Sequence, residues 1–116
     1  MSMKSKSYEI VESLRLDLDK IKSDEGIIGY ILRDAKSASI DIKDPSKIID
    51  YAALSSTALE SGESVSDVFG LGDIYSVVVE GKDVKVLSMS AGNSRVSIFM
   101  SRNVDHKKIC KDLHLK

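Results

Sequence analysis

The spacing of hydrophobic residues changes along the chain, and these changes predict the order of its helices and strands. Between residues 8 and 23, apolar residues recur three or four positions apart, which is typical of an amphipathic helix. Residues 26–33 are apolar on both sides, which indicates a central strand covered on both faces. Residues 38–42 alternate, as expected of an outer strand with one wet face. The remaining pattern predicts a helix from Pro45, strands over 73–80, 84–91 and 95–101, and a helix from Asp105 to about Leu113.

The order is therefore helix, two strands, helix, three strands, helix. Residues 80–83 and 91–94 have the turn chemistry of hairpins, so the last three strands are expected to be antiparallel neighbours. This order predicts an α/β domain of the α+β type, in which a five-stranded antiparallel sheet carries helices on both faces. We expect a single domain over residues 8–113, preceded by a flexible tail of residues 1–7.

The middle helix carries more apolar surface than one sheet contact requires. Asp44 and Pro45 form a strong helix start, and Ser61-Gly62 reads as the stop. The side expected to cover the sheet consists of Ile48, Ile49, Ala52, Ser55, Ser56 and Leu59. A second, narrower stripe consists of Tyr51, Leu54 and Ala58. Residues 62–72 are expected to form an irregular connection in which Val65, Val68 and Phe69 tuck under as a short turn of helix.

The strand predicted over residues 73–80 repeats this surplus. Its side chains alternate in direction, with Ile74 and Val78 on one face and Tyr75, Val77 and Val79 on the other. At the edge of the sheet, its open backbone would be a template for another chain. The helix and the strand together therefore predict a partner rather than a reaction. The other interpretation is that the terminal helices bury both surpluses within one monomer.

Composition places the chain among ordinary soluble globular domains. Its 116 residues are 42% hydrophobic and 30% charged, with a net charge of −1, so we expect no attraction to nucleic acid and no insertion into a membrane. Cys110 is the single cysteine, and the sequence has neither a signal peptide nor a long apolar run. We therefore expect a cytoplasmic protein.

Candidate chemistry is sparse, and it does not favour an enzyme. His106, Cys110 and His114 follow one another at intervals of four residues, so neighbouring pairs share a helical face that suits a soft metal ion. The outer two lie about 12 Å apart along a helix axis, too far for one ion, and Cys110 sits on the apolar side as a small hydrophobe. The pair Gly70 and Gly72 precedes a strand, whereas a phosphate loop precedes a helix. We expect no catalytic residue, no metal and no cofactor.

Several local features together resemble the roadblock/dynein light chain family over Tyr8 to Leu113. They are the opening strand Gly26-Ile27-Ile28-Gly29, the hairpin at Asp34, the small-residue helix around Ala52-Ala53-Leu54, Gly72 leading into the strand over 73–80, and the closing strands that end at Phe99. The chain departs from the family at the first hairpin. Ser37 ends the turn that begins at Asp34, where family members often have glycine.

The resemblance implies a non-catalytic homodimer. Family members pair through the middle helix and the strand after it, and they act as scaffolds or regulators of small Ras-like GTPases or as light chains in larger motor complexes. Carried over by position, the dimer interface would comprise Tyr51, Leu54, Ala58, Ile74, Ser76 and Val78. The alternative hypothesis is a monomeric profilin-like or PAS-like sensor domain that binds a small ligand against the sheet, in a cavity lined by Gly29, Met89 and Met100.

Overall fold

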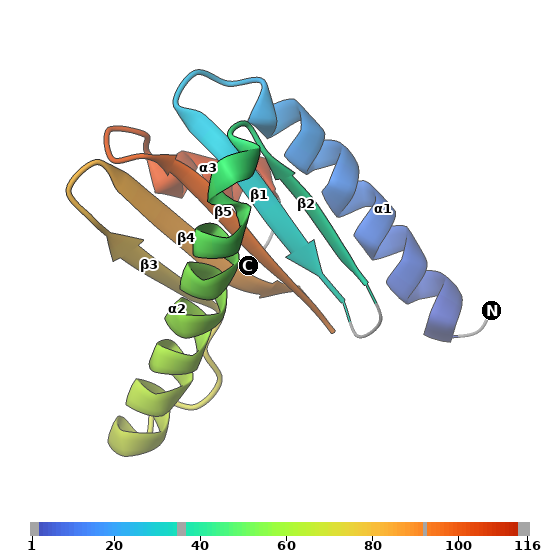
Figure 1. The fold of residues 1–116 in the computed structure, drawn as a ribbon. Helices are drawn as coiled ribbons and strands as arrows, with labels where there is room; N and C mark the ends of the chain where they lie inside the picture. The colour runs from blue at the N-terminus through green and yellow to red at the C-terminus, as the bar shows by residue number, and fades with distance from the viewer. Residues whose placement is uncertain (1–2, 35–36, 92, 114–116) are drawn as a thin grey trace.

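A computed structural model describes residues 3–34, 37–91 and 93–113. It contains one five-stranded antiparallel sheet with the strand order β2-β1-β5-β4-β3 (Figure 1). The elements are α1 (Met3–Lys22), β1 (Ile27–Arg33), β2 (Ala38–Ile42), the short 3-10 helix η1 (Pro45–Lys47), α2 (Ile48–Phe69), β3 (Ser76–Glu80), β4 (Val84–Ala91), β5 (Ser94–Ser101) and α3 (His106–Asp112). This order and this sheet confirm the predicted fold class.

Helices cover both faces of the sheet, as the sequence predicts, and each face has its own hydrophobic core (Figure 1). Helices α1 and α3 cover one face with Leu14, Leu18, Ile21, Ile109 and Leu113, which pack on alternate residues of β1, β4 and β5. Helix α2 covers the other face, where it packs on Ile31, Ile42, Val86 and Phe99. Strands β1, β5 and β4 therefore bury side chains in both directions, which explains their continuous apolar runs.

The strands lie close to their predicted positions because their turns and alternation are unambiguous. Strand β1 is an interior strand between β2 and β5, and β2 and β3 form the two edges. At Gly29 the β2 backbone comes so close that an added Cβ would overlap the Asp41 carbonyl oxygen and lie 2.7 Å from the Ile42 Cα. Glycine is therefore needed at this position for close packing.

Helix α1 begins at Met3, five residues before the predicted start at Tyr8. Residues 3–7 were expected to belong to the tail, but they contain neither proline nor glycine, and methionine and lysine favour helix. The helix is tied to the sheet by polar contacts as well as by its core side chains. Arg15 Nη2 donates to Ser39 Oγ at 3.1 Å, and Lys22 Nζ lies 2.6 Å from Asp41 Oδ1.

Helix α2 does not end at Gly62, so that prediction and the irregular connection after it are wrong. Asp44 caps the short 3-10 helix η1, which leads directly into α2, by accepting from the backbone N–H of Ser46. The helix then runs to Phe69, and Gly70 ends it in the left-handed conformation with φ of 63°. Gly62 has a different role, because an added Cβ there would lie 2.5 Å from Val77 Cγ2. Its lack of a side chain lets the helix approach β3.

Candidate interaction surface

The rotation of α2 about its axis decides which of its side chains remain available to a partner. The ring of Tyr51 packs on Phe99 of β5 with centroids 4.6 Å apart, and Ala58 is only 3% exposed. Tyr51 and Leu54 are half-buried against the same core. The stripe formed by Tyr51, Leu54 and Ala58 was expected to face away from the sheet, and this orientation is wrong. Ile49, expected to face the sheet, is 83% exposed.

A chain of buried hydroxyl groups fixes the same orientation. Ser55 Oγ of α2 lies 2.5 Å from Ser97 Oγ of β5, which in turn lies 2.7 Å from Ser88 Oγ of β4. All three serines are buried, so each hydroxyl depends on the others for its hydrogen bonds. Ser55 therefore points to one place on the sheet, and the helix cannot turn without breaking this chain.

Two polar contacts show which side of α2 faces β1 and β5. Arg33 of β1 donates to Ser56 Oγ at 3.2 Å, and Arg95 Nη2 of β5 lies 3.3 Å from Glu63 Oε1. Ser56 and Glu63 lie on one side of the helix, so the opposite side faces β4 and the free edge of β3. That side carries Leu54, Val65 and Val68, three residues of one helical stripe. We call these three residues, with Val79 of β3, the seam.

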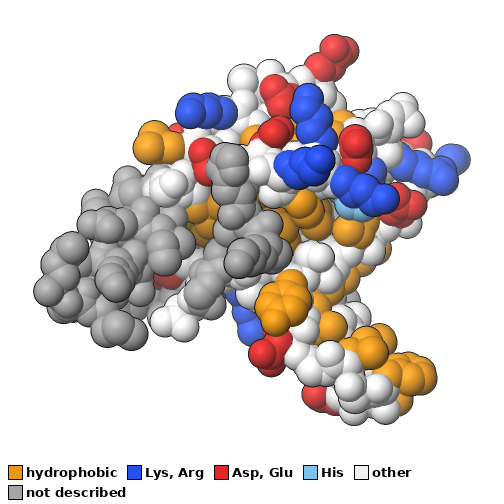
Figure 2. Space-filling view, turned by 180° about the vertical axis from the view of Figure 1, so that it is seen from behind, with side chains coloured by type: hydrophobic (Ala, Val, Ile, Leu, Met, Phe, Trp, Pro, Cys, Tyr) orange, Lys and Arg blue, Asp and Glu red, His pale blue; other side chains and the backbone are white. Residues whose placement is uncertain are grey.

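The C-terminal half of α2 projects past the end of the sheet (Figure 1). Val68 is 77% exposed and Phe69 72%, and Val65 and Val79 are exposed as well. Figure 2 shows hydrophobic side chains gathered on this protruding end beside acidic ones. The expectation that Val65, Val68 and Phe69 tuck under the sheet is wrong. Sequence reasoning missed their exposure because it ended the helix at Gly62, so these residues were not expected to continue the helix past the end of the sheet.

Strand β3 is an edge strand, as the sequence interpretation required. It begins at Ser76, so Ile74 and Tyr75 precede it rather than belong to it. Ile74 is half-buried near Gly62, and Val78 is half-buried against the core under α1 and α3. Ser76 is exposed. Of the six residues predicted for a dimer interface, Ser76 is exposed and Ala58 is enclosed by its own chain, and the other four, Tyr51, Leu54, Ile74 and Val78, are half-buried.

The residues considered for metal binding are engaged elsewhere. Lys85 Nζ lies 3.2 Å from His106 Nδ1, and Cys110 Sγ lies 3.9 Å from Met89 Sδ. Burial raises the pKa of the Cys110 thiol, which suits its role as a small hydrophobe. His114 lies outside the described residues, and within them no three His, Cys, Asp or Glu side chains are grouped as a metal site. No described helix is long and apolar enough to cross a membrane.

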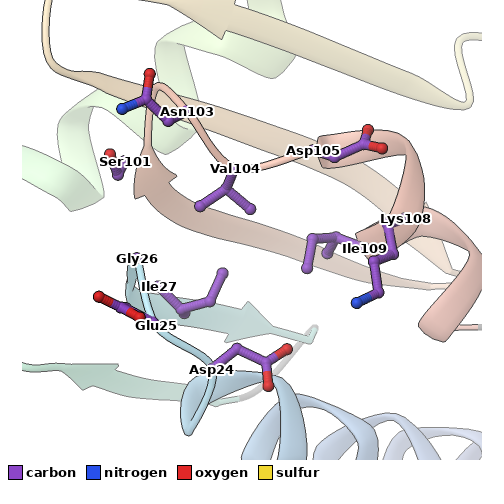
Figure 3. A pocket seen from close by; sticks show the side chains of 10 residues that line it. All are labelled: Asp24, Glu25, Gly26, Ile27, Ser101, Asn103, Val104, Asp105, Lys108 and Ile109. Carbon is purple, nitrogen blue, oxygen red and sulfur yellow. The ribbon is translucent and has the colours of Figure 1, made fainter.

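Two of the cavities lined by described residues can be placed in the fold, and neither is lined by Gly29, Met89 or Met100. One, of about 570 Å³, lies where the turn after α1 faces the loop between β5 and α3 (Figure 3). Asp105, on its rim, is already the N-cap of α3. The other, of about 480 Å³, lies beside the end of α2. Met89 and Met100 are buried in the core under α1 and α3.

The fold is similar to that of solved structures. A Roadblock/LC7 domain from Streptomyces avermitilis superposes with a TM-score of 0.69, at 18% identity, covering 85% of this chain and 87% of that one. The gliding protein MglB from Thermus thermophilus superposes with a TM-score of 0.64, at 14% identity, covering 89% of this chain and 82% of that one. No protein-family model and no curated protein sequence matches the chain. The chain has the roadblock/LC7 fold, as the resemblance implied.

Proposed function

We propose that this protein is a non-catalytic, cytoplasmic interaction module that pairs with a second copy of itself. The observation that carries the proposal is the exposure of Val65, Val68 and Val79 of the seam next to the open edge of β3. Val65 is 50% exposed and Val68 77%, and large exposed apolar patches on a folded domain mark interaction sites. In a twofold pair, the β3 edges would join two sheets into one while the α2 helices meet along their seams.

The seam revises the interface expected from the sequence without changing its place in the fold. Leu54, Ser76 and the backbone of β3 remain part of the proposed interface. Ala58 leaves it because its side chain is buried, and Val65, Val68 and Val79 enter it. Ile74 and Val78 contribute from beneath by positioning β3.

In the roadblock family such pairs are scaffolds or regulators of small Ras-like GTPases or parts of larger complexes. By this resemblance we infer that the paired module binds a Ras-like GTPase. The test is binding of purified Ras-like GTPases from the same cell, loaded with GDP or a GTP analogue, by biolayer interferometry. We expect at least one of them to bind in a nucleotide-dependent way, and equal failure of all of them in both states would refute this partner class.

Pairing itself is tested by light scattering coupled to size exclusion. The 12.7 kDa chain is expected to elute with twice that mass. Val68→Asp should give the monomer mass, because pairing would bury two carboxylates that face each other across the twofold axis. Leu16→Asp is the matched control, since Leu16 is an exposed leucine on α1, away from the seam. A wild-type monomer at tens of micromolar, or a Val68→Asp variant that still pairs, would refute the proposal.

A further inference from the structure

Helix α2 and strand β3 carry acidic side chains and no basic side chains of their own. Residues 48–81 contain six acidic residues and no lysine or arginine, although the whole chain is close to neutral, with 17 basic and 18 acidic residues. The acidic residues are Asp50, Glu60, Glu63, Asp67, Asp73 and Glu80. Glu63 lies near Arg95 and Glu80 near Lys85, and the other four give this part of the surface a negative field that attracts cationic groups.

The negative charge is concentrated beside a hollow at the end of α2. The 480 Å³ cavity there is lined by Glu63, Ser66, Asp67, Asp73, Ile74 and Tyr75, among others. Glu63 is paired with Arg95. Asp67 and Asp73 are exposed, and no cation of the described residues forms an ion pair with either of them. Two carboxylates and the face of a tyrosine ring suit the ammonium of lysine or the guanidinium of arginine.

The cavity adjoins exposed apolar side chains that the loop holds in place. Phe69, Leu71 and Tyr75 are all exposed, and we call these three residues the tip. The loop is closed onto the helix, because the Ser66 carbonyl accepts from the N–H groups of Gly70 and Leu71, the latter at 3.1 Å. The buried Ser66 hydroxyl also donates to the Gly72 carbonyl. The tip is therefore preorganised, which lowers the entropy cost of binding.

We propose that the tip and its cavity bind a short basic and apolar segment of another protein. A lysine or arginine of that segment enters the cavity between Asp67 and Asp73, and its apolar neighbours cover Phe69 and Leu71. The cavity lies on the Glu63 side of α2, opposite the seam, so this binding does not depend on pairing. A second copy presenting this same cavity is disfavoured as the occupant, because Asp67 and Asp73 of each copy would then face like charges.

The probe is a fluorescein-labelled dodecapeptide of three Leu-Arg-Lys-Leu repeats, compared with its charge-reversed form of three Leu-Glu-Asp-Leu repeats. Fluorescence anisotropy is measured with the full chain in 50 mM and 300 mM NaCl. We expect saturable binding of the basic peptide, weakening at the higher salt, and no binding of the acidic peptide. Equal binding of both peptides would mean that the protein recognises only their apolar side chains and not their charge, and it would overturn the proposal.

Two double variants with equal changes in net charge separate a site from a general field. Asp67→Lys with Asp73→Lys should weaken basic-peptide binding at least tenfold, whereas Glu25→Lys with Asp112→Lys, at exposed positions elsewhere, should change it less than threefold. Circular dichroism checks folding, and Asp67→Asn with Asp73→Asn replaces the first pair should it not fold. Equal weakening by both double variants would refute a local site.

Two further measurements exclude other occupants. Mg²⁺ at 5 mM should compete no better than the same ionic strength of NaCl, and stronger competition would assign the cavity to a bare cation and overturn the proposal. The Val68→Asp variant, monomeric at the seam, should retain peptide binding and should not self-associate. If the Val68→Asp variant still self-associates and adding Asp67→Lys abolishes that association, the occupant of the cavity is a second copy, which would overturn the proposal. A wild-type chain that binds the peptide but does not pair would refute the proposed pairing alone. A chain that pairs but does not bind the peptide would refute the proposed peptide site alone.

Discussion

The Tyr51 ring lies against the Phe99 ring with centroids 4.6 Å apart and planes tilted by 37°, and this pair joins α2 to the centre of the sheet. Phe99 is fully buried and comes from β5, the middle strand of the five. The contact sets the rotation of the helix, because Ser55 and Ala58 then also face the sheet. The seam on the β3 side of α2 is a consequence of this packing.

We expect Tyr51→Ala to destabilise the monomer by about 2–3 kcal/mol, because the substitution removes a half-buried ring and leaves a cavity over Phe99. Urea denaturation followed by circular dichroism measures the change. Tyr51→Phe keeps the ring and should alter the free energy of unfolding by less than about 0.5 kcal/mol. An unchanged stability of Tyr51→Ala would mean that the ring does not pack on the sheet.

The buried hydroxyl chain makes a second prediction. Ser97→Ala is expected to cost about 1–3 kcal/mol, because it removes the shared partner of Ser55 and Ser88 and leaves both hydroxyls buried without their bond. Ser55→Ala should cost less, since Ser97 and Ser88 still bond to each other. Replacing all three serines by alanine should cost less than the sum of the single changes. Additive single effects in urea denaturation would contradict a connected chain.

The close approach of α2 and β3 makes a third prediction. Gly62→Ala places a Cβ 2.5 Å from Val77 Cγ2, and the stiff valine cannot easily move away. The overpacking is expected to exceed the gain in helix propensity, for a net loss of about 1 kcal/mol. Ser61→Ala, one residue earlier on an exposed side, has the propensity gain alone and should be neutral or stabilising. A Gly62→Ala variant more stable than wild type would show that no close contact exists.

The strands could be predicted because their signals are local. Alternation assigns Val96 and Ile98 to one face and Phe99 to the other, and the turns at Gly81 and Asn93 set the hairpins. The same reasoning could not predict that β3 lies at a sheet edge, because strand order depends on long-range pairing. It predicted only what an edge position would imply. The structure places β3 at an edge.

The rotation and end of α2 could not be predicted because both are decided by residues far away in the sequence. A helix rich in alanine and serine has little contrast between its sides, so its pattern does not identify the one that faces the sheet. Phe99 and Ser97 decide it from β5. Likewise, a glycine in a helix looks the same whether it ends the helix or admits a neighbour. Val77 determines which role Gly62 has.

The Tyr30 hydroxyl makes the last prediction, a loss of stability at high pH. It donates to Asp19 Oδ1 at 2.9 Å, and burial, this hydrogen bond and the charge of Asp19 raise the pKa of Tyr30 from 10.0 to about 12. The unfolded chain therefore releases this proton near pH 10 while the folded chain still holds it. The contribution of Tyr30 to stability is complete below pH 10 and is lost as the pH rises through 12.

Urea denaturation at pH 8, 10 and 11 measures this loss, with Tyr30→Phe as the control. At pH 8 the variant should be less stable by about 1 kcal/mol because it lacks the hydrogen bond to Asp19. All other titratable groups are common to both proteins, so the informative quantity is the difference between the two curves. The wild type should lose more stability than Tyr30→Phe between pH 8 and 11, and the difference should shrink with rising pH. Parallel curves would mean that the Tyr30 hydroxyl titrates alike in the folded and unfolded chains.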